Sequence, residues 1–157
     1  MWKDIFKTTA IAGTLDILAA FTKAFISNKV TPGIVLKFIA SGIMGNEAFS
    51  GDYPIMILGL IIHFFIVFCI TLTFFLVYPK LRFLKQSIFL NSFLIAIIAW
   101  TITTQIIIPL SKIKTPPFNL LNAFMAITIL YVCIGLPIAF FTRHYYRGLP
   151  GKSNGRK

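Results

Sequence analysis

The chain has 157 residues, of which 57% are hydrophobic and 12% charged, and 15 lysines and arginines against 4 acids give a net charge of +11. A soluble domain usually carries about 25% charged residues and at most about half apolar residues, so this composition excludes an ordinary soluble domain. We therefore expect a protein that is embedded in a membrane.

The first apolar segment extends from about residue 5 to residue 26 and is interrupted by Lys7, Asp16 and Lys23. Its position allows two interpretations, a transmembrane helix or a signal peptide. The helix is favoured, because the apolar region of a signal peptide should carry no charge and no convincing small-residue cleavage site precedes Lys23.

The connection between Ser27 and Tyr53 contains a short amphipathic segment. Thr31 and Pro32 form the pattern typical of an N-cap followed by proline at the first helical position, which predicts a helix over about residues 31–42. This extracytoplasmic helix would be either interfacial or re-entrant. The irregular segment after it contains glycine and asparagine. It must contact water or protein, because lipid cannot form hydrogen bonds with its backbone groups.

Three uncharged apolar segments follow, at about residues 54–78, 88–110 and 118–142. Each exceeds the roughly 20 residues that a helix needs to cross a hydrocarbon core of about 30 Å. Short connections that contain proline end these segments and make neighbouring helices antiparallel. The sequence thus predicts an all-α membrane protein with four transmembrane helices in an antiparallel bundle. This single domain would cover residues 1–147, with a disordered basic tail at 148–157.

The basic residues indicate how the chain is oriented. Both termini and the connection near Lys80 would share one side, which holds ten of the 15 lysines and arginines, whereas the other side holds five. Because cytoplasmic loops carry the basic excess, we expect both termini in the cytoplasm. Once this excess is assigned to topology, no basic stripe remains for nucleic acid. The expected partner is therefore the lipid bilayer and not nucleic acid, and the sequence indicates no soluble partner.

The sequence lacks the motifs of enzymes and of metal sites. Cys69 and Cys133 lie in separate apolar segments, where thiols are more often packing residues than ligands. His63 and His144 lie at different depths and do not have metal-ligand spacing. Phosphate-binding, dinucleotide-binding and Ser-His-Asp signatures are missing as well. We therefore expect no catalytic activity, no cofactor and no metal.

The informative residues are the polar side chains within the apolar segments. An aspartate at the centre of a transmembrane helix costs about 2.5 to 3.5 kcal/mol on insertion, so Asp16 should face the bundle interior with a partner, or be protonated. Its helical face also carries Gly13, Ala20 and Lys23, and small residues mark faces that pack against other helices. Asp16 is therefore the best candidate for a functional residue.

Depth arithmetic places further polar residues near Asp16. Counted from the outer helix ends at about 1.5 Å per residue, Asp16 lies roughly 15 Å deep and His63 about 13 Å deep. The inner half of the same helices is almost entirely apolar. This pattern predicts a vestibule that opens outward and is closed below. Its candidate residues for binding or proton relay are Asp16, His63, Gln105, Asn122, Thr101 and Lys23.

Two functions remain open for this vestibule. Asp16 and His63, if they are close, would titrate as a coupled pair that binds or passes a proton, a cation or a small polar solute, in one chain or in a homo-oligomer. Alternatively, the polar residues serve only helix packing in a structural or accessory membrane protein, at about 0.6 kcal/mol per interhelical hydrogen bond. The packing interpretation is favoured for Gln105, Asn122 and Thr101, whereas function is slightly favoured for Asp16.

Four strings in the chain resemble those of a known group of proteins, namely Gly59–His63, Tyr78–Lys80, Pro109–Leu110 and Thr115–Phe118. They are similar to strings in small bacterial inner-membrane proteins of the YagU type and in related four-helix families of unknown function, mainly over residues 59–118. The resemblance implies a location in the bacterial cytoplasmic (inner) membrane. It implies no substrate and no catalytic residue.

Overall fold

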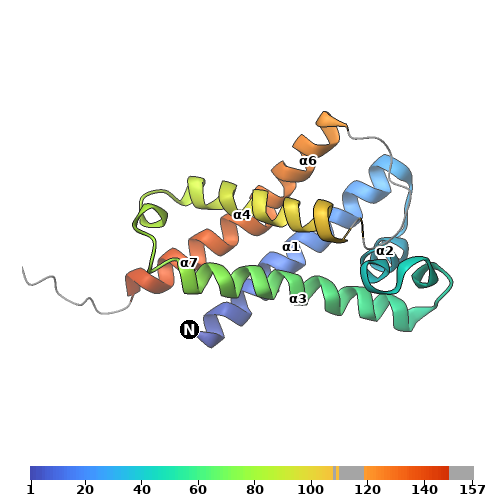
Figure 1. Ribbon diagram of the computed structural model, residues 1–157, viewed down its shortest axis with the longest axis horizontal. Coiled ribbons are helices and arrows are strands. Elements are labelled where there is room, and N and C mark those ends of the chain that lie inside the picture. The colour runs from blue at the N-terminus through green and yellow to red at the C-terminus, as the bar shows by residue number, and fades with distance from the viewer. Residues whose placement is uncertain (108, 110–118, 149–157) are drawn as a thin grey trace, which may run out of the picture.

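The computed structural model describes residues 1–107, 109 and 119–148, and the regular structure of these residues is entirely helical (Figure 1). The predicted all-α fold is therefore confirmed. The helices in chain order are α1 (Trp2–Asn28), α2 (Pro32–Met44), α3 (Tyr53–Val77), α4 (Ile88–Ile102), α6 (Leu120–Leu130) and α7 (Leu136–Gly148). The short turns are the 3-10 turns η1 (Gly45–Phe49) and η2 (Arg82–Lys85) and the π turns η3 (Thr103–Ile107) and η4 (Tyr131–Gly135).

Four stretches of helix in the described residues are long and apolar enough to cross a membrane, as predicted. They are Trp2–Ser27, Tyr53–Val77, Ile88–Gln105 and Leu120–Gly148. The last stretch is α6, η4 and α7 in succession, so the helix continues beyond the predicted end at residue 142 and includes Gly148. Residues 110–118 and the predicted tail at 149–157 lie outside the described residues.

Local signals explain where several helices begin and end. Helix α1 ends where Lys29 takes a left-handed conformation (φ 53°, ψ 28°), which allows its N–H to bond to the carbonyl of Phe25 at 3.0 Å. Helix α2 begins with Pro32 after the extended residue Thr31, as predicted. Helix α4 begins after Ser87, whose hydroxyl accepts a hydrogen bond from a backbone N–H of the first turn.

The long helices pack side by side, and α2 crosses them at one end (Figure 1). Helix α1 packs against α3 on one side and against η4 and α7 on the other, and α4 packs against η4, α6 and α7. Helices α3 and α4 make few contacts with each other, which leaves one open seam in the bundle. Both described ends of the chain and η2 lie at one end of the bundle, here called the terminal end, and α2 lies at the other, here called the α2 end.

Two glycines allow the backbones to approach closely. A Cβ atom at Gly59 of α3 would lie 2.0 Å from the carbonyl oxygen of Leu36 in α2. A Cβ atom at Gly135 in η4 would lie 2.3 Å from the carbonyl oxygen of Ser92 in α4. Any larger residue at these positions would push the helices apart, so the glycines fix the tight packing of α2 on α3 and of η4 on α4.

Candidate functional site

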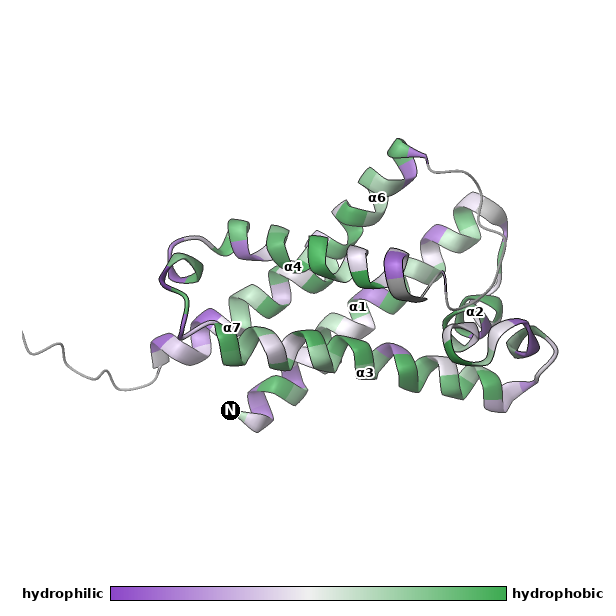
Figure 2. Cartoon of the chain, viewed as in Figure 1, coloured by the Kyte–Doolittle hydropathy of each residue, from purple (hydrophilic) through white to green (hydrophobic). Residues whose placement is uncertain are grey.

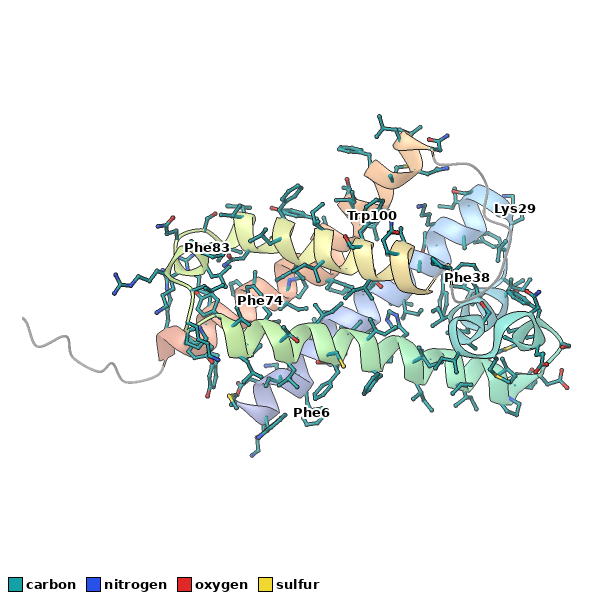
Figure 3. The ribbon with its side chains drawn as sticks, viewed as in Figure 1. Phe6, Lys29, Phe38, Phe74, Phe83 and Trp100 are labelled. Atoms are coloured by element: carbon teal, nitrogen blue, oxygen red, sulfur yellow. The ribbon has the colours of Figure 1, made fainter. Side chains whose placement is uncertain are left out.

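A cavity of about 620 Å³ opens at the α2 end of the bundle, and α1, α2, α3, α4, η3 and α6 all contribute to its wall. Phe38 and Trp100, which are labelled in Figure 3, line it from α2 and α4. We call it the polar cavity, because it gathers polar side chains from helices that carry many green, hydrophobic residues in Figure 2. Its polar lining residues are Asp16, Lys23, Ser27, His63, Thr103, Thr104 and Asn122.

Helix α1 presents one continuous face to the polar cavity. Asp16, Ala20, Lys23 and Ser27 follow one another at spacings of three or four residues, which places them on the same side of a helix. Asp16 is half-buried on this face. One turn toward the terminal end, Ala12 is fully buried and belongs to the hydrophobic core of the bundle. The polar face of α1 therefore begins where its tightly packed part ends.

His63 is held in place by a hydrogen bond between helices. Its Nε2 atom lies 2.9 Å from the carbonyl oxygen of Gly13, and the side chain is buried. A carbonyl oxygen can only accept, so Nε2 carries a hydrogen and donates it. In the neutral ring, the Nδ1 atom is then a hydrogen-bond acceptor.

Gly13 makes this contact possible. A Cβ atom at position 13 would lie 2.7 Å from the ring of Phe64, the neighbour of His63 on α3. A larger residue would displace this ring, so the glycine lets α1 pack on α3 with its carbonyl against the imidazole.

Asp16 and His63 line the same cavity and are close enough to interact electrostatically. Cys133 of η4 also lies near Asp16. The one ion pair among the described residues joins the N-terminal ammonium group to Asp4 at 3.0 Å, so Asp16 forms no ion pair with any of them. The site thus combines a carboxyl group without a cationic partner and an imidazole whose tautomer is fixed by the backbone.

Four of the six residues singled out in the sequence meet in the polar cavity. Besides Asp16 and His63, these are Lys23, which is half-buried, and Asn122, which is exposed. Gln105 and Thr101 are not part of its lining, and both are exposed. The hydroxyl of Thr101 donates to the carbonyl of Ile97 in its own helix at 2.8 Å.

The structure adds Trp100, Thr103 and Thr104 to the site. They lie on adjoining turns of α4 and η3, and the two hydroxyls donate to backbone carbonyls at 2.9 and 2.8 Å. The sequence contains a signal for this site, because residues spaced by three and four positions lie on one face of a helix.

The expectation of an almost entirely apolar inner half is wrong. Thr9, Asn91 and Thr142 are buried toward the terminal end of the bundle. The Oγ1 atoms of Thr9 and Thr142 and the Oδ1 atom of Asn91 have no hydrogen-bond partner among the described residues. None of the three lines the polar cavity, so this second set of polar groups lies apart from it.

No group of three or more histidine, cysteine or acidic residues that could hold a metal gathers among residues 1–107, 109 and 119–148. No protein-family model, curated protein sequence or solved structure matches this chain. The resemblance to proteins of the YagU type therefore stays a prediction.

Proposed function

We propose that the protein binds a proton and, in competition with it, a small solute with a cationic group in the polar cavity. The observation that supports this proposal most directly is the placement of Asp16, which has no ion pair with a described residue, beside His63 in one cavity of about 620 Å³. Known small-molecule sites have volumes of about 300 to 1,000 Å³, so the space suits such a solute.

The chemistry follows from the charges of the pair. With Asp16 ionised and His63 neutral, the pair carries a net negative charge that no ion pair with a described residue compensates, and such a charge attracts a cation strongly where water is scarce. Protonation of either group removes this net charge, so a proton and a cation compete for the same site. The indole of Trp100 adds an aromatic surface of the kind that favours organic cations.

Lys23 limits which solutes fit. It lies seven residues from Asp16 on the same face of α1, which corresponds to about 10.5 Å along the helix. A bare cation can bind at Asp16 but is repelled near Lys23, whereas a solute that also carries an acceptor or acidic group would be held at both ends. The proposed solute is therefore small and polar, with its cationic group at Asp16.

The orientation and the membrane are part of this proposal. The basic excess supports cytoplasmic termini, and the polar cavity at the opposite α2 end would then open to the outside of a bacterial inner membrane. The polar cavity is lined by one chain, so binding needs no second copy, although a homo-oligomer is compatible with it. We propose no catalytic step.

The fluorescence of Trp100 tests the proposal. In a Trp2→Phe variant, Trp100 is the only tryptophan that remains. Its emission in lipid nanodiscs should change with pH as the Asp16 and His63 pair titrates. Tetramethylammonium should move the midpoint to lower pH, because the cation binds the deprotonated form. Both effects should disappear in Asp16→Asn and persist in Glu47→Gln, which neutralises an exposed acid on η1.

The structural alternative has one observation in its favour, since the bond between His63 and Gly13 joins α1 to α3. If the polar residues served packing alone, tetramethylammonium would move the midpoint no more in the Trp2→Phe protein than in its Asp16→Asn variant. That result would overturn the proposed binding function.

A further inference from the structure

A second cavity, of about 600 Å³, lies in the open seam between α3 and α4. We call it the apolar groove. Phe65, Ile66 and Val77 line it from α3, and Leu94 and Ile98 line it from α4. Phe65 and Ile98 are 64% and 52% exposed, so the groove faces the surroundings of the bundle and not its core. A groove of this kind in a membrane is filled by acyl chains or by another helix.

The length of the apolar groove matches one leaflet. From Phe65 to Val77 the groove follows α3 for 12 residues, or roughly 18 Å, whereas half of a hydrocarbon core of about 30 Å is about 15 Å. Leu84 of η2 closes it at the terminal end. The groove therefore occupies the leaflet on the side of the termini and ends at the level of η2.

Cationic residues surround this closed end. Lys80, Arg82 and Lys85 are exposed on and beside η2, which carries purple, hydrophilic residues in Figure 2. Arg143 and Arg147 of α7 lie near Tyr78, at the same end of α3. The acid of this end, Asp4, is already paired with the N-terminal ammonium group. An apolar groove of leaflet length with a cationic end is complementary to a phospholipid with an anionic headgroup.

We propose that the apolar groove binds one anionic phospholipid, with an acyl chain between α3 and α4 and its phosphate against Arg82 and Lys85. A second copy of the chain is the less suitable occupant. In the same membrane orientation it would bring its own cationic terminal end to the level of η2, where like charges would meet. Ile66 and Ile70 line both cavities, but the apolar groove extends from there toward the terminal end and does not depend on the function proposed for the polar cavity.

Native mass spectrometry of the purified full-length protein, titrated with phosphatidylglycerol or phosphatidylcholine, tests this proposal. The first phosphatidylglycerol should bind more tightly than the first phosphatidylcholine. The double variant Arg82→Gln, Lys85→Gln should weaken phosphatidylglycerol binding about tenfold to thirtyfold, since each basic residue near a membrane surface contributes about 1 kcal/mol, which is about fivefold. The matched control Lys3→Gln, Lys7→Gln removes the same charge on α1 and should leave the binding unchanged.

A second variant tests the apolar part of the site. Ile98→Trp places a larger side chain on the wall of the groove and should weaken the binding of both lipids, with the protein still monodisperse in detergent. Equal loss in the control and in the η2 double variant would overturn the proposal, and so would unchanged binding in Ile98→Trp. Cys69 lines the groove, so a Cys69 disulfide between chains in a Cys133→Ser variant would show that a second copy fills it, and would overturn the proposal as well.

Discussion

Asp16 differs from the other acidic residues of the chain in what surrounds it. Asp4 is paired with the N-terminal ammonium group, whereas Glu47 and Asp52 are exposed near η1 and the start of α3. Asp16 alone lies in the middle of a span, in a cavity whose one cationic side chain among the described residues, Lys23, forms no ion pair with it. The cost of keeping a carboxyl group at this depth is what makes a role in binding more plausible for it than a role in packing.

Gly13 supports the site because it has no side chain at the contact between α1 and α3. We expect Gly13→Ala to destabilise the protein by about 1 to 3 kcal/mol, because the added Cβ lies 2.7 Å from the Phe64 ring, which must shift within the packed contact of α1 and α3. Thermal unfolding in detergent measures this effect. Gly148→Ala is the matched control, since a Cβ there meets nothing within 4 Å. An equal loss of stability in both variants would contradict this account of Gly13.

At the scale of elements, the transmembrane helices could be predicted from the sequence, whereas the burial of polar residues toward the terminal end could not. Lipid enforces long apolar helices, so hydropathy alone finds α1, α3, α4 and the α6 to α7 stretch. Threonine gives a weak signal, because its hydroxyl can bond to its own helix, as Thr71 does to Val67 at 2.8 Å. Whether such a residue faces lipid or the core depends on the rotational orientation of its helix in the bundle. In this bundle that orientation buries Thr9 and Thr142.

The length of α7 also depended on tertiary contacts. The hydroxyl of Tyr146 donates to the carbonyl of Phe75 at 2.8 Å, and its ring stacks on Tyr78 with 5.4 Å between centroids. These contacts fix the last turns of α7 against the end of α3. They explain why the helix continues past residue 142, where the apolar sequence gives way to Arg143 and His144.

Loss of that hydrogen bond should have a measurable cost. We expect Tyr146→Phe to lower the free energy of unfolding by about 0.5 to 1.5 kcal/mol, because the ring stacking is kept and only the bond to Phe75 is removed. Denaturant titration in detergent measures the change. Tyr145→Phe is the matched control, since its ring also contacts Tyr146. No hydrogen bond of the Tyr145 hydroxyl is found among the described residues, so an equal loss in both variants would contradict the role assigned to the bond.

At the scale of the whole molecule, the two cavities follow from one packing asymmetry. Helix α1 contacts both α3 and the η4 to α7 stretch, whereas α3 and α4 meet only loosely. The short connection between residues 78 and 88 predicts antiparallel neighbours but not how tightly they pack, so the apolar groove had no signal in the sequence. The bundle thus has a polar cavity at its α2 end and a lipid-facing groove toward its terminal end.

Cysteine labelling tests the polar cavity and its orientation together. In a variant in which Cys69 and Cys133 are replaced by serine, Ala20→Cys should react with a charged thiol reagent added outside intact cells, whereas Leu18→Cys should not. Ala20 lines the polar cavity, whereas Leu18 is 54% exposed on another face of α1. The two positions differ by about 3 Å in depth, so only access to water separates them, and water is needed to form the reactive thiolate. Labelling of both positions or of neither would contradict a water-filled cavity, and labelling of Ala20→Cys only from the cytoplasmic side would contradict the proposed orientation.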